Sequence, residues 1–129
     1  MTQQSKLQTP RAAVSHLGSA RSGTQHAWRQ RLTSFALLPL TIAFVAILVS
    51  LAGRDYESAR ALLGSPCPAI LLILFIAAGA WHMALGLQVV IEDYIPSEHA
   101  KTLALMANSV FSAVIGLAGV YAVLRLSFT

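Results

Sequence analysis

Charged residues are scarce in this sequence. Only 11% of its 129 residues are Asp, Glu, Lys or Arg, against about 25% in an average soluble domain. Three long stretches, residues 32–53, 65–91 and 102–124, contain no charge at all. A bilayer core of about 30 Å needs roughly 20 residues of helix, and each stretch meets that length. The sequence therefore predicts an all-α membrane protein with three transmembrane helices.

Cysteine is almost absent as well, because Cys67 is the only one in the chain. A single thiol excludes an internal disulfide and any metal site built from several cysteines. Acidic residues are also few, with five Asp and Glu against nine Lys and Arg. In a soluble protein such a basic excess often indicates nucleic-acid binding. In a membrane protein it has a simpler explanation in the orientation of the chain, and no nucleic-acid partner is expected.

The basic residues predict this orientation. Six precede the first span or lie in the loop between the second and third spans: Lys6, Arg11, Arg21, Arg29, Arg31 and Lys101. Three lie on the other side: Arg54, Arg60 and Arg125. Because cytoplasmic segments carry the excess of Lys and Arg, we expect a cytoplasmic N-terminus and a periplasmic C-terminus. The expected location is the bacterial inner membrane, crossed more than once.

The polar N-terminal segment and the apolar remainder form two regions. Residues 1–27 contain no acidic residue, and we expect them to form a basic cytoplasmic arm; a transit peptide is the alternative. A cleaved signal peptide is not expected, because the first apolar run begins only at Leu32 and is too long. Residues 28–129 are expected to form the membrane anchor. Its spans are predicted at about residues 30–53, 67–92 and 101–125.

The second span contains a histidine, His82, near its middle. An ionisable side chain at that depth is costly and indicates a functional site, although a neutral histidine bonded to a neighbouring helix is the alternative. At about 100° per residue, Ala78, Gly79 and Gly86 fall within ~60° of His82. A flat group such as a haem edge could lie against this bare face, and so could a closely packed helix. No second histidine lies at membrane depth, so another axial ligand would come from another chain.

The second span ends in an acid and a phenol, Asp93 and Tyr94. Asp93 follows His82 by 11 residues, which places it on the same helix face and about 16 Å nearer the cytoplasm. Arg31, at the start of the first span, is expected on the same side of the membrane. Together these residues could hold a small quinone, with Tyr94 as a hydrogen-bond donor and Asp93 as a titratable acid. Ordinary membrane-interface placement is the alternative for Tyr94 and Arg31.

The third span carries small and polar residues along one side: Asn108, Ser112, Gly116 and Gly119. Small residues at this spacing allow two helices to approach closely. The contact could lie within the chain or with a partner subunit, and the sequence favours neither. With three spans and short loops, the chain is expected to be a subunit of a larger assembly.

Two motifs resemble a known family. They are HAWRQRLTS at residues 26–34 and HMALGLQVVIEDY at residues 82–94. The second follows a pattern of His82, Gly86, Val90, Asp93 and Tyr94. The sequence resembles the hydrophobic membrane anchor (small cytochrome b) subunits of bacterial succinate dehydrogenase over about residues 20–126. One departure is that paired aromatic residues commonly follow the first histidine in the family, whereas Ala27 and Trp28 follow His26 here, so the role of His26 stays open.

The resemblance implies a function in the respiratory chain and the tricarboxylic acid cycle. His82 would be an axial ligand of haem b, shared with a second membrane cytochrome b subunit. Tyr94 would hydrogen-bond ubiquinone, Asp93 would support the quinone pocket, and Arg31 would lie near the haem propionates or the quinone. A flavoprotein subunit would oxidise succinate, and an iron–sulfur subunit would pass the electrons on to the quinone pool. The chain itself would be a non-catalytic anchor of this enzyme complex.

A second interpretation belongs to a different class. The chain could be a cofactor-free membrane adaptor, or a small transporter subunit that uses His82 as a proton relay. A transporter would be expected to carry further charges within its other spans, and the sequence has none there.

Overall fold

Four helices account for most of the chain in the computed structural model, which describes residues 22–128. They are α2 (Ser22–Leu51), α3 (Tyr56–Gly64), α4 (Pro66–Tyr94) and α5 (Glu98–Phe128). The described range contains no strand, so the all-α prediction is confirmed for residues 22–128. Residues 1–21 of the expected arm lie outside the described residues, while residues 22–27 belong to α2.

Three of these helices are long and apolar enough to cross a membrane: Thr24–Leu51, Pro66–Tyr94 and Glu98–Phe128. Their most apolar windows have mean hydropathies of 2.4, 2.2 and 1.9. The three-span prediction is confirmed, and the chain is a multi-pass membrane protein. The second and third helices extend beyond the spans expected from hydropathy, because a helix continues past the apolar core until its backbone is interrupted. The loop with Pro96 ends α4 in this way, since proline cannot continue the helical hydrogen bonds.

The first and second spans are joined by a short surface segment. Gly53 adopts a positive φ of 78°, a conformation that favours glycine, and it turns the chain after α2. The carboxylate of Asp55 then caps α3 by accepting a hydrogen bond from the backbone N–H of Ser58 at 3.3 Å. Hydrogen bonding from the Ser58 side chain, and then from its backbone N–H, lowers the pKa of this carboxyl group below its usual value. The loop thus contains a stable helical turn at the membrane boundary.

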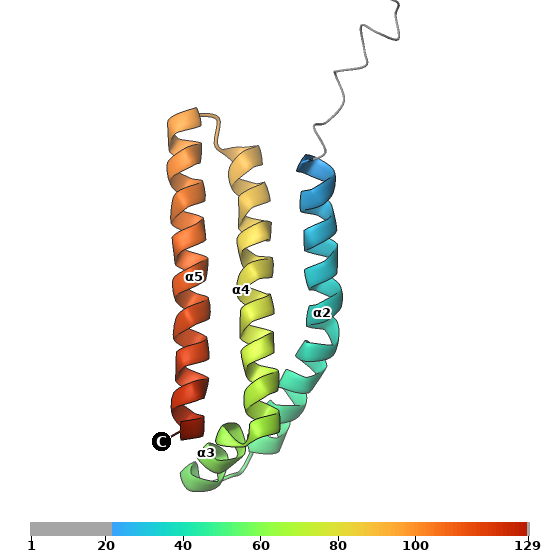
Figure 1. Ribbon diagram of the computed structural model, residues 1–129, viewed down its shortest axis with the longest axis vertical. Helices are drawn as coiled ribbons and strands as arrows, with labels where there is room; N and C mark the ends of the chain where they lie inside the picture. The colour runs from blue at the N-terminus through green and yellow to red at the C-terminus, as the bar shows by residue number, and fades with distance from the viewer. Residues whose placement is uncertain (1–21, 129) are drawn as a thin grey trace, which may run out of the picture.

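In the ribbon, α4 lies between α2 and α5 (Figure 1). The start of α2 and the α4–α5 loop lie at one end of the molecule, and α3 and the end of α5 lie at the other. Pro39 lies inside α2, where it lacks the N–H for one backbone hydrogen bond. The second half of α2 leans toward the lower end of α4 (Figure 1). The three long helices thus form a single layer with two broad faces.

Small side chains bring α5 against α4. A Cβ atom added at Gly116 would lie 3.1 Å from Ala80 Cβ, and one added at Gly119 would lie 2.8 Å from Ile76 Cγ2. The Asn108 side chain donates a hydrogen bond to the Ala84 carbonyl at 2.9 Å. These residues therefore face α4. The sequence left open whether they contact another helix of the chain or a partner subunit, and the structure shows the contact within the chain.

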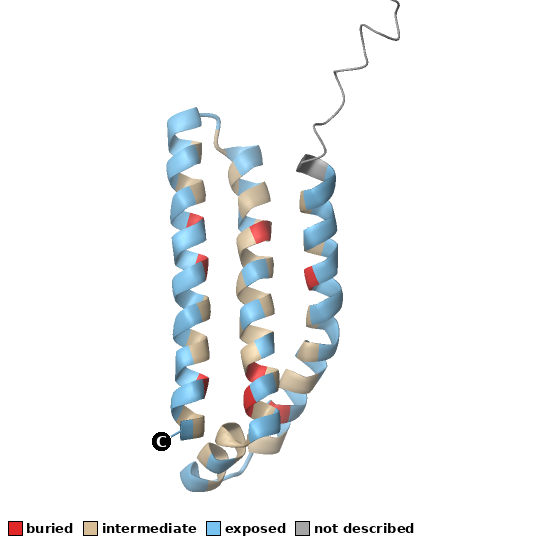
Figure 2. Ribbon diagram, in the orientation of Figure 1, coloured by how far each residue is buried: buried red, intermediate tan, exposed pale blue. Residues whose placement is uncertain are grey.

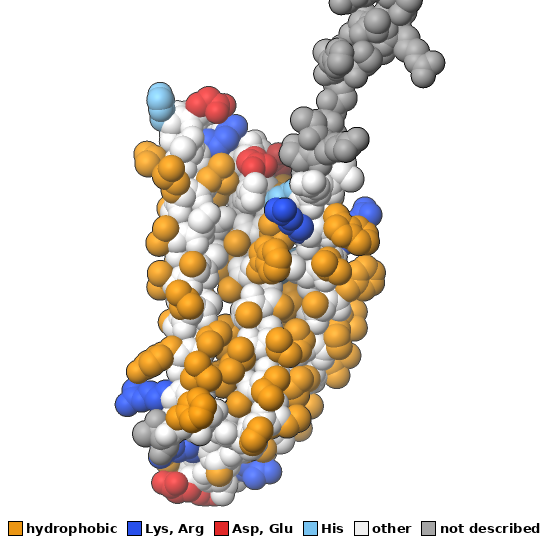
Figure 3. Space-filling view, in the orientation of Figure 1, with side chains coloured by type: hydrophobic (Ala, Val, Ile, Leu, Met, Phe, Trp, Pro, Cys, Tyr) orange, Lys and Arg blue, Asp and Glu red, His pale blue; other side chains and the backbone are white. Residues whose placement is uncertain are grey.

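Most side chains point outward. Figure 2 shows buried positions only where the long helices face one another, and Figure 3 shows hydrophobic side chains along the helices with charges gathered at the two ends. One buried cluster lies toward the α3 end: Ile47, Ala69, Leu72 and Val123. Nearby, the rings of Phe44 and Phe75 stack with their centroids 4.6 Å apart. An apolar exterior of this kind is suited to lipid and to partner helices.

Candidate functional site

His82 lies near the middle of α4, as the seventeenth of the helix's 29 residues. About 18 Å of helix rise separate it from Tyr94, and about 24 Å separate it from Pro66. Its ring faces α2, where the Nδ1 atom lies 2.9 Å from the Thr33 hydroxyl oxygen in a hydrogen bond. Thr33 is buried, with 8% of its surface exposed. The histidine therefore has a fixed partner on the neighbouring helix.

The Thr33 hydroxyl is held by its own helix as well. Its oxygen lies 2.9 Å from the Gln30 carbonyl and 3.1 Å from the Arg29 carbonyl. Such bonds from a threonine to the preceding turn are common inside helices. They fix the position of the hydroxyl, and with it the position of the His82 ring.

The bare face predicted beside His82 is present in the fold. A Cβ atom added at Gly86 would meet nothing within 4 Å, and one added at Gly79 would only touch Leu37 Cδ2 at 4.0 Å. A groove of about 490 Å³ lies along α2 beside His82 of α4. It is lined by Ser34, Leu37, Leu38, Thr41, Ile42 and His82. The groove is open and largely apolar, and it is accessible to a flat hydrophobic group.

The second ring nitrogen of His82, a residue that lines this groove, has no partner in the described part of the chain. Within residues 22–128, Nε2 takes part in no hydrogen bond, since Thr33 bonds only Nδ1. No group of three or more His, Cys, Asp or Glu side chains in this range could hold a metal ion. A single imidazole can supply only one ligand, so a metal at His82 would need its other ligands from a macrocycle and another chain. This donor set fits haem iron, for which histidine is a common axial ligand.

Asp93 and Tyr94 lie at the end of α4, as predicted. Both side chains are exposed, and Tyr94 is 81% exposed. Asp93 is about 16 Å of helix rise beyond His82 and on nearly the same side of the helix. Neither residue has a hydrogen-bond or ion-pair partner through its side chain in the described part of the chain. Their polar atoms are therefore free to meet a ligand or a neighbouring subunit.

Arg31 does not join this acid–phenol pair. It precedes Thr33 by two residues, so its backbone lies only about 3 Å of helix rise from the level of Thr33 and His82. Its side chain is exposed and lies on α2 one turn before Ser34, which lines the groove. Its predicted place near the haem propionates or the quinone stays a prediction.

Two further residues, both on α2, have contacts that the sequence did not predict. Thr33 is one of them: the HAWRQRLTS motif offers two adjacent hydroxyl groups, and nothing in the sequence distinguishes Thr33 from Ser34 as the partner of His82. The Nε2 atom of His26 is buried and has no hydrogen-bond partner within residues 22–128. His26 precedes Thr33 by seven residues, about two turns, so both lie on one side of α2. His26 therefore also faces toward α4.

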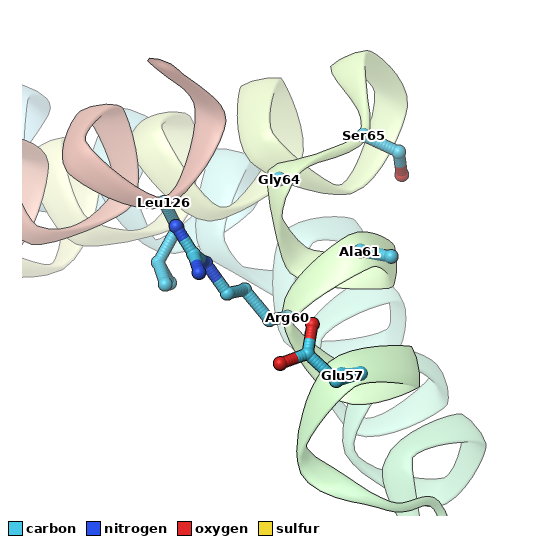
Figure 4. Close-up of a pocket in the computed structure, with 6 residues that line it drawn as sticks. All are labelled: Glu57, Arg60, Ala61, Gly64, Ser65 and Leu126. Atoms are coloured by element: carbon cyan, nitrogen blue, oxygen red, sulfur yellow. The ribbon is translucent and has the colours of Figure 1, made fainter. Parts of the chain in front are cut away.

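Two other hollows lie away from the imidazole face of α4. One, of about 430 Å³, lies between α4 and α5 beside Trp81, whose side chain points about 160° away from Gly79 around the helix. The other, of about 320 Å³, lies at the α3 end, where the Arg60 side chain extends toward Leu126 (Figure 4). Neither hollow includes a residue of the candidate site.

Comparison with known proteins identifies relatives of this chain. Residues 5–117 match the sequence model of the family described as succinate dehydrogenase/fumarate reductase transmembrane subunit. The succinate dehydrogenase hydrophobic membrane anchor subunit of Paracoccus denitrificans is 35% identical over 118 residues, covering 92% of this chain and 91% of that protein. The protein of the same name from Rickettsia bellii (strain RML369-C) is 30% identical over 95 residues, or 74% and 76% of the two chains. No solved structure matches the chain.

Proposed function

Since the chain belongs to the family of succinate dehydrogenase/fumarate reductase transmembrane subunits, we propose that it anchors a succinate:quinone oxidoreductase and helps to bind haem b and ubiquinone. The observation that carries this proposal is the difference between the two ring nitrogens of His82. At the middle of a transmembrane helix, one of its nitrogens is bonded within the chain and the other is available beside an open apolar groove. A polar group at that depth is costly unless it is used.

His82 provides one axial ligand of haem b through Nε2. The absence of side chains at Gly79 and Gly86 leaves room for the edge of a macrocycle against α4. The other axial ligand comes from a histidine of a second membrane cytochrome b subunit, because residues 22–128 offer no second imidazole at this depth. Haem b supplies one-electron redox chemistry within the membrane.

Arg31 interacts with the haem propionates. Its position one turn before the groove residue Ser34, at nearly the depth of His82, supports this role over a role at the quinone. A guanidinium offers up to five donors in a planar fork that suits carboxylates. The positive charge also offsets the cost of placing two carboxylates near the hydrocarbon region.

Tyr94 and Asp93 form the part of a ubiquinone site that this chain contributes. The exposed Tyr94 hydroxyl donates a hydrogen bond to a quinone carbonyl oxygen, and Asp93 supports the pocket as a nearby acid. Quinone reduction consumes two protons along with two electrons, so a titratable group at the membrane boundary is well placed. The remaining walls of the pocket come from the partner subunits.

The soluble partners dock at the end of the molecule that holds Asp93 and Tyr94. They are an iron–sulfur subunit, which passes electrons toward the quinone pool, and a flavoprotein subunit, which oxidises succinate in the tricarboxylic acid cycle. The larger number of basic residues on that side supports a cytoplasmic N-terminus, a periplasmic C-terminus and a location in the bacterial inner membrane.

Replacement of His82 tests the haem ligand. In the purified complex, His82→Ala removes one axial ligand, so the low-spin b-type absorbance and electron paramagnetic resonance signals of the haem should be lost or converted to high spin. The partner subunit can still retain the macrocycle, and for this reason spin state is measured along with haem content. An unchanged spectrum and an unchanged midpoint potential would contradict ligation by His82, and would favour a cofactor-free adaptor.

Replacement of Tyr94 tests the quinone site. Tyr94→Phe removes one hydroxyl and keeps the ring, so succinate–ubiquinone turnover should fall by roughly tenfold, the equivalent of one hydrogen bond of about 1.4 kcal/mol. Succinate reduction of a dye that takes electrons from the soluble subunits should be unaffected. Tyr121→Phe, an exposed tyrosine near the other end of α5, is the matched control. Intact quinone turnover in Tyr94→Phe would refute the role of Tyr94.

Cysteine labelling tests the orientation. In a Cys67→Ser background, which leaves no other thiol in the chain, a cysteine replaces either Glu57 of α3 or His99 at the start of α5; both positions are exposed. A maleimide that cannot cross membranes should label the cysteine at position 57 in intact spheroplasts. It should label the cysteine at position 99 only after the membrane is opened. The reverse pattern would overturn the proposed orientation.

A further inference from the structure

The hydrogen bond between Thr33 and His82 raises the question of which partner donates the proton. The Thr33 oxygen lies within hydrogen-bond distance of three atoms: the carbonyl oxygens of Arg29 and Gln30, and Nδ1 of His82. A carbonyl oxygen can only accept, whereas an imidazole nitrogen can donate or accept according to its tautomer. The hydroxyl has one proton, so it can satisfy either a carbonyl of α2 or the ring nitrogen.

The two possibilities have opposite consequences for His82. If the hydroxyl donated to Nδ1, a neutral ring would carry its proton on Nε2, and that nitrogen could not bind iron. If the hydroxyl donates to the Gln30 carbonyl at 2.9 Å, its lone pair faces Nδ1, and Nδ1–H is the donor. The lone pair of Nε2 is then free at the groove. Only the second arrangement is compatible with a metal at His82.

We propose that Thr33 is a positioning residue for the haem ligand: its hydroxyl, held by the preceding turn of α2, accepts a hydrogen bond from Nδ1–H of His82 and thereby fixes the ring tautomer and the direction of Nε2. This inference rests on the proposed function, because it assumes that His82 binds the haem iron. It assigns to α2 a part in ligation, although α2 contributes no ligand itself.

The bond also has an electronic effect. An imidazole that donates its other N–H to an acceptor becomes a more basic ligand. A more basic axial ligand stabilises ferric iron relative to ferrous iron, and hydrogen bonding around the ligand is one of the means by which a protein sets a haem potential. Thr33 therefore lowers the midpoint potential of the haem in addition to orienting its ligand.

The test compares Thr33→Val with Thr33→Ser in the purified complex. Valine keeps the shape of threonine and removes the acceptor, whereas serine keeps the hydroxyl. The haem midpoint potential should rise in Thr33→Val, and haem transfer to apomyoglobin should accelerate by about 10- to 100-fold, the usual effect of losing such an outer partner. Thr33→Ser should retain the wild-type values for both. Thr33→Ala, which adds no bulk, replaces the valine variant if that variant does not assemble.

Ser109→Ala is the control for loss of a hydroxyl at membrane depth, since Ser109 bonds only to the Leu105 carbonyl of its own helix. It should change neither measurement. If Thr33→Val retains the wild-type potential and haem retention while His82→Ala loses the low-spin haem, the role of Thr33 is refuted and the proposed function stands. If His82→Ala also leaves the haem unchanged, the proposed function itself fails.

Discussion

The scarcity of water in the hydrocarbon core is the constraint on which this structure depends. Each polar side chain at that depth must find a partner inside the protein, because lipid offers none. Two contacts between helices meet this demand. Thr33 pairs with His82 across α2 and α4, and Asn108 pairs with the Ala84 carbonyl across α5 and α4. The central helix is thereby joined to both neighbours within three residues of its length.

These contacts have different outcomes on the two sides of α4. Near Asn108, small residues draw α5 close to α4, and the polar groups are consumed within the chain. Near Thr33, a groove lined by His82 and by residues of α2 is open, and Nε2 of His82 has no hydrogen-bond partner in the described residues. The first contact holds the anchor together. The second leaves one nitrogen of His82 without a partner, as the proposed haem site requires.

The sequence was sufficient to predict the three spans, the place of Tyr94 at the end of the second, and the helix face that His82 shares with Gly79 and Gly86. Charge-free length sets the spans, and helical periodicity sets which residues share a face. The partner of His82 could not be predicted, because it depends on how α2 and α4 align, and Thr33 and Ser34 are equally plausible in the sequence. Nor does the apolar run show that α2 begins at Ser22, about eight residues before the span expected from residue 30.

The account centres on Nε2 of His82 as an iron ligand. The most direct test is a cryo-electron microscopy structure of the intact complex at a resolution that shows side-chain rotamers. It should show Nε2 of His82 bonded to haem iron on the α2–α4 face, with Nδ1 still within hydrogen-bond distance of the Thr33 hydroxyl. A haem ligated through other residues, such as His26, or a partner helix packed against Gly79 and Gly86 with no haem at His82, would contradict the account.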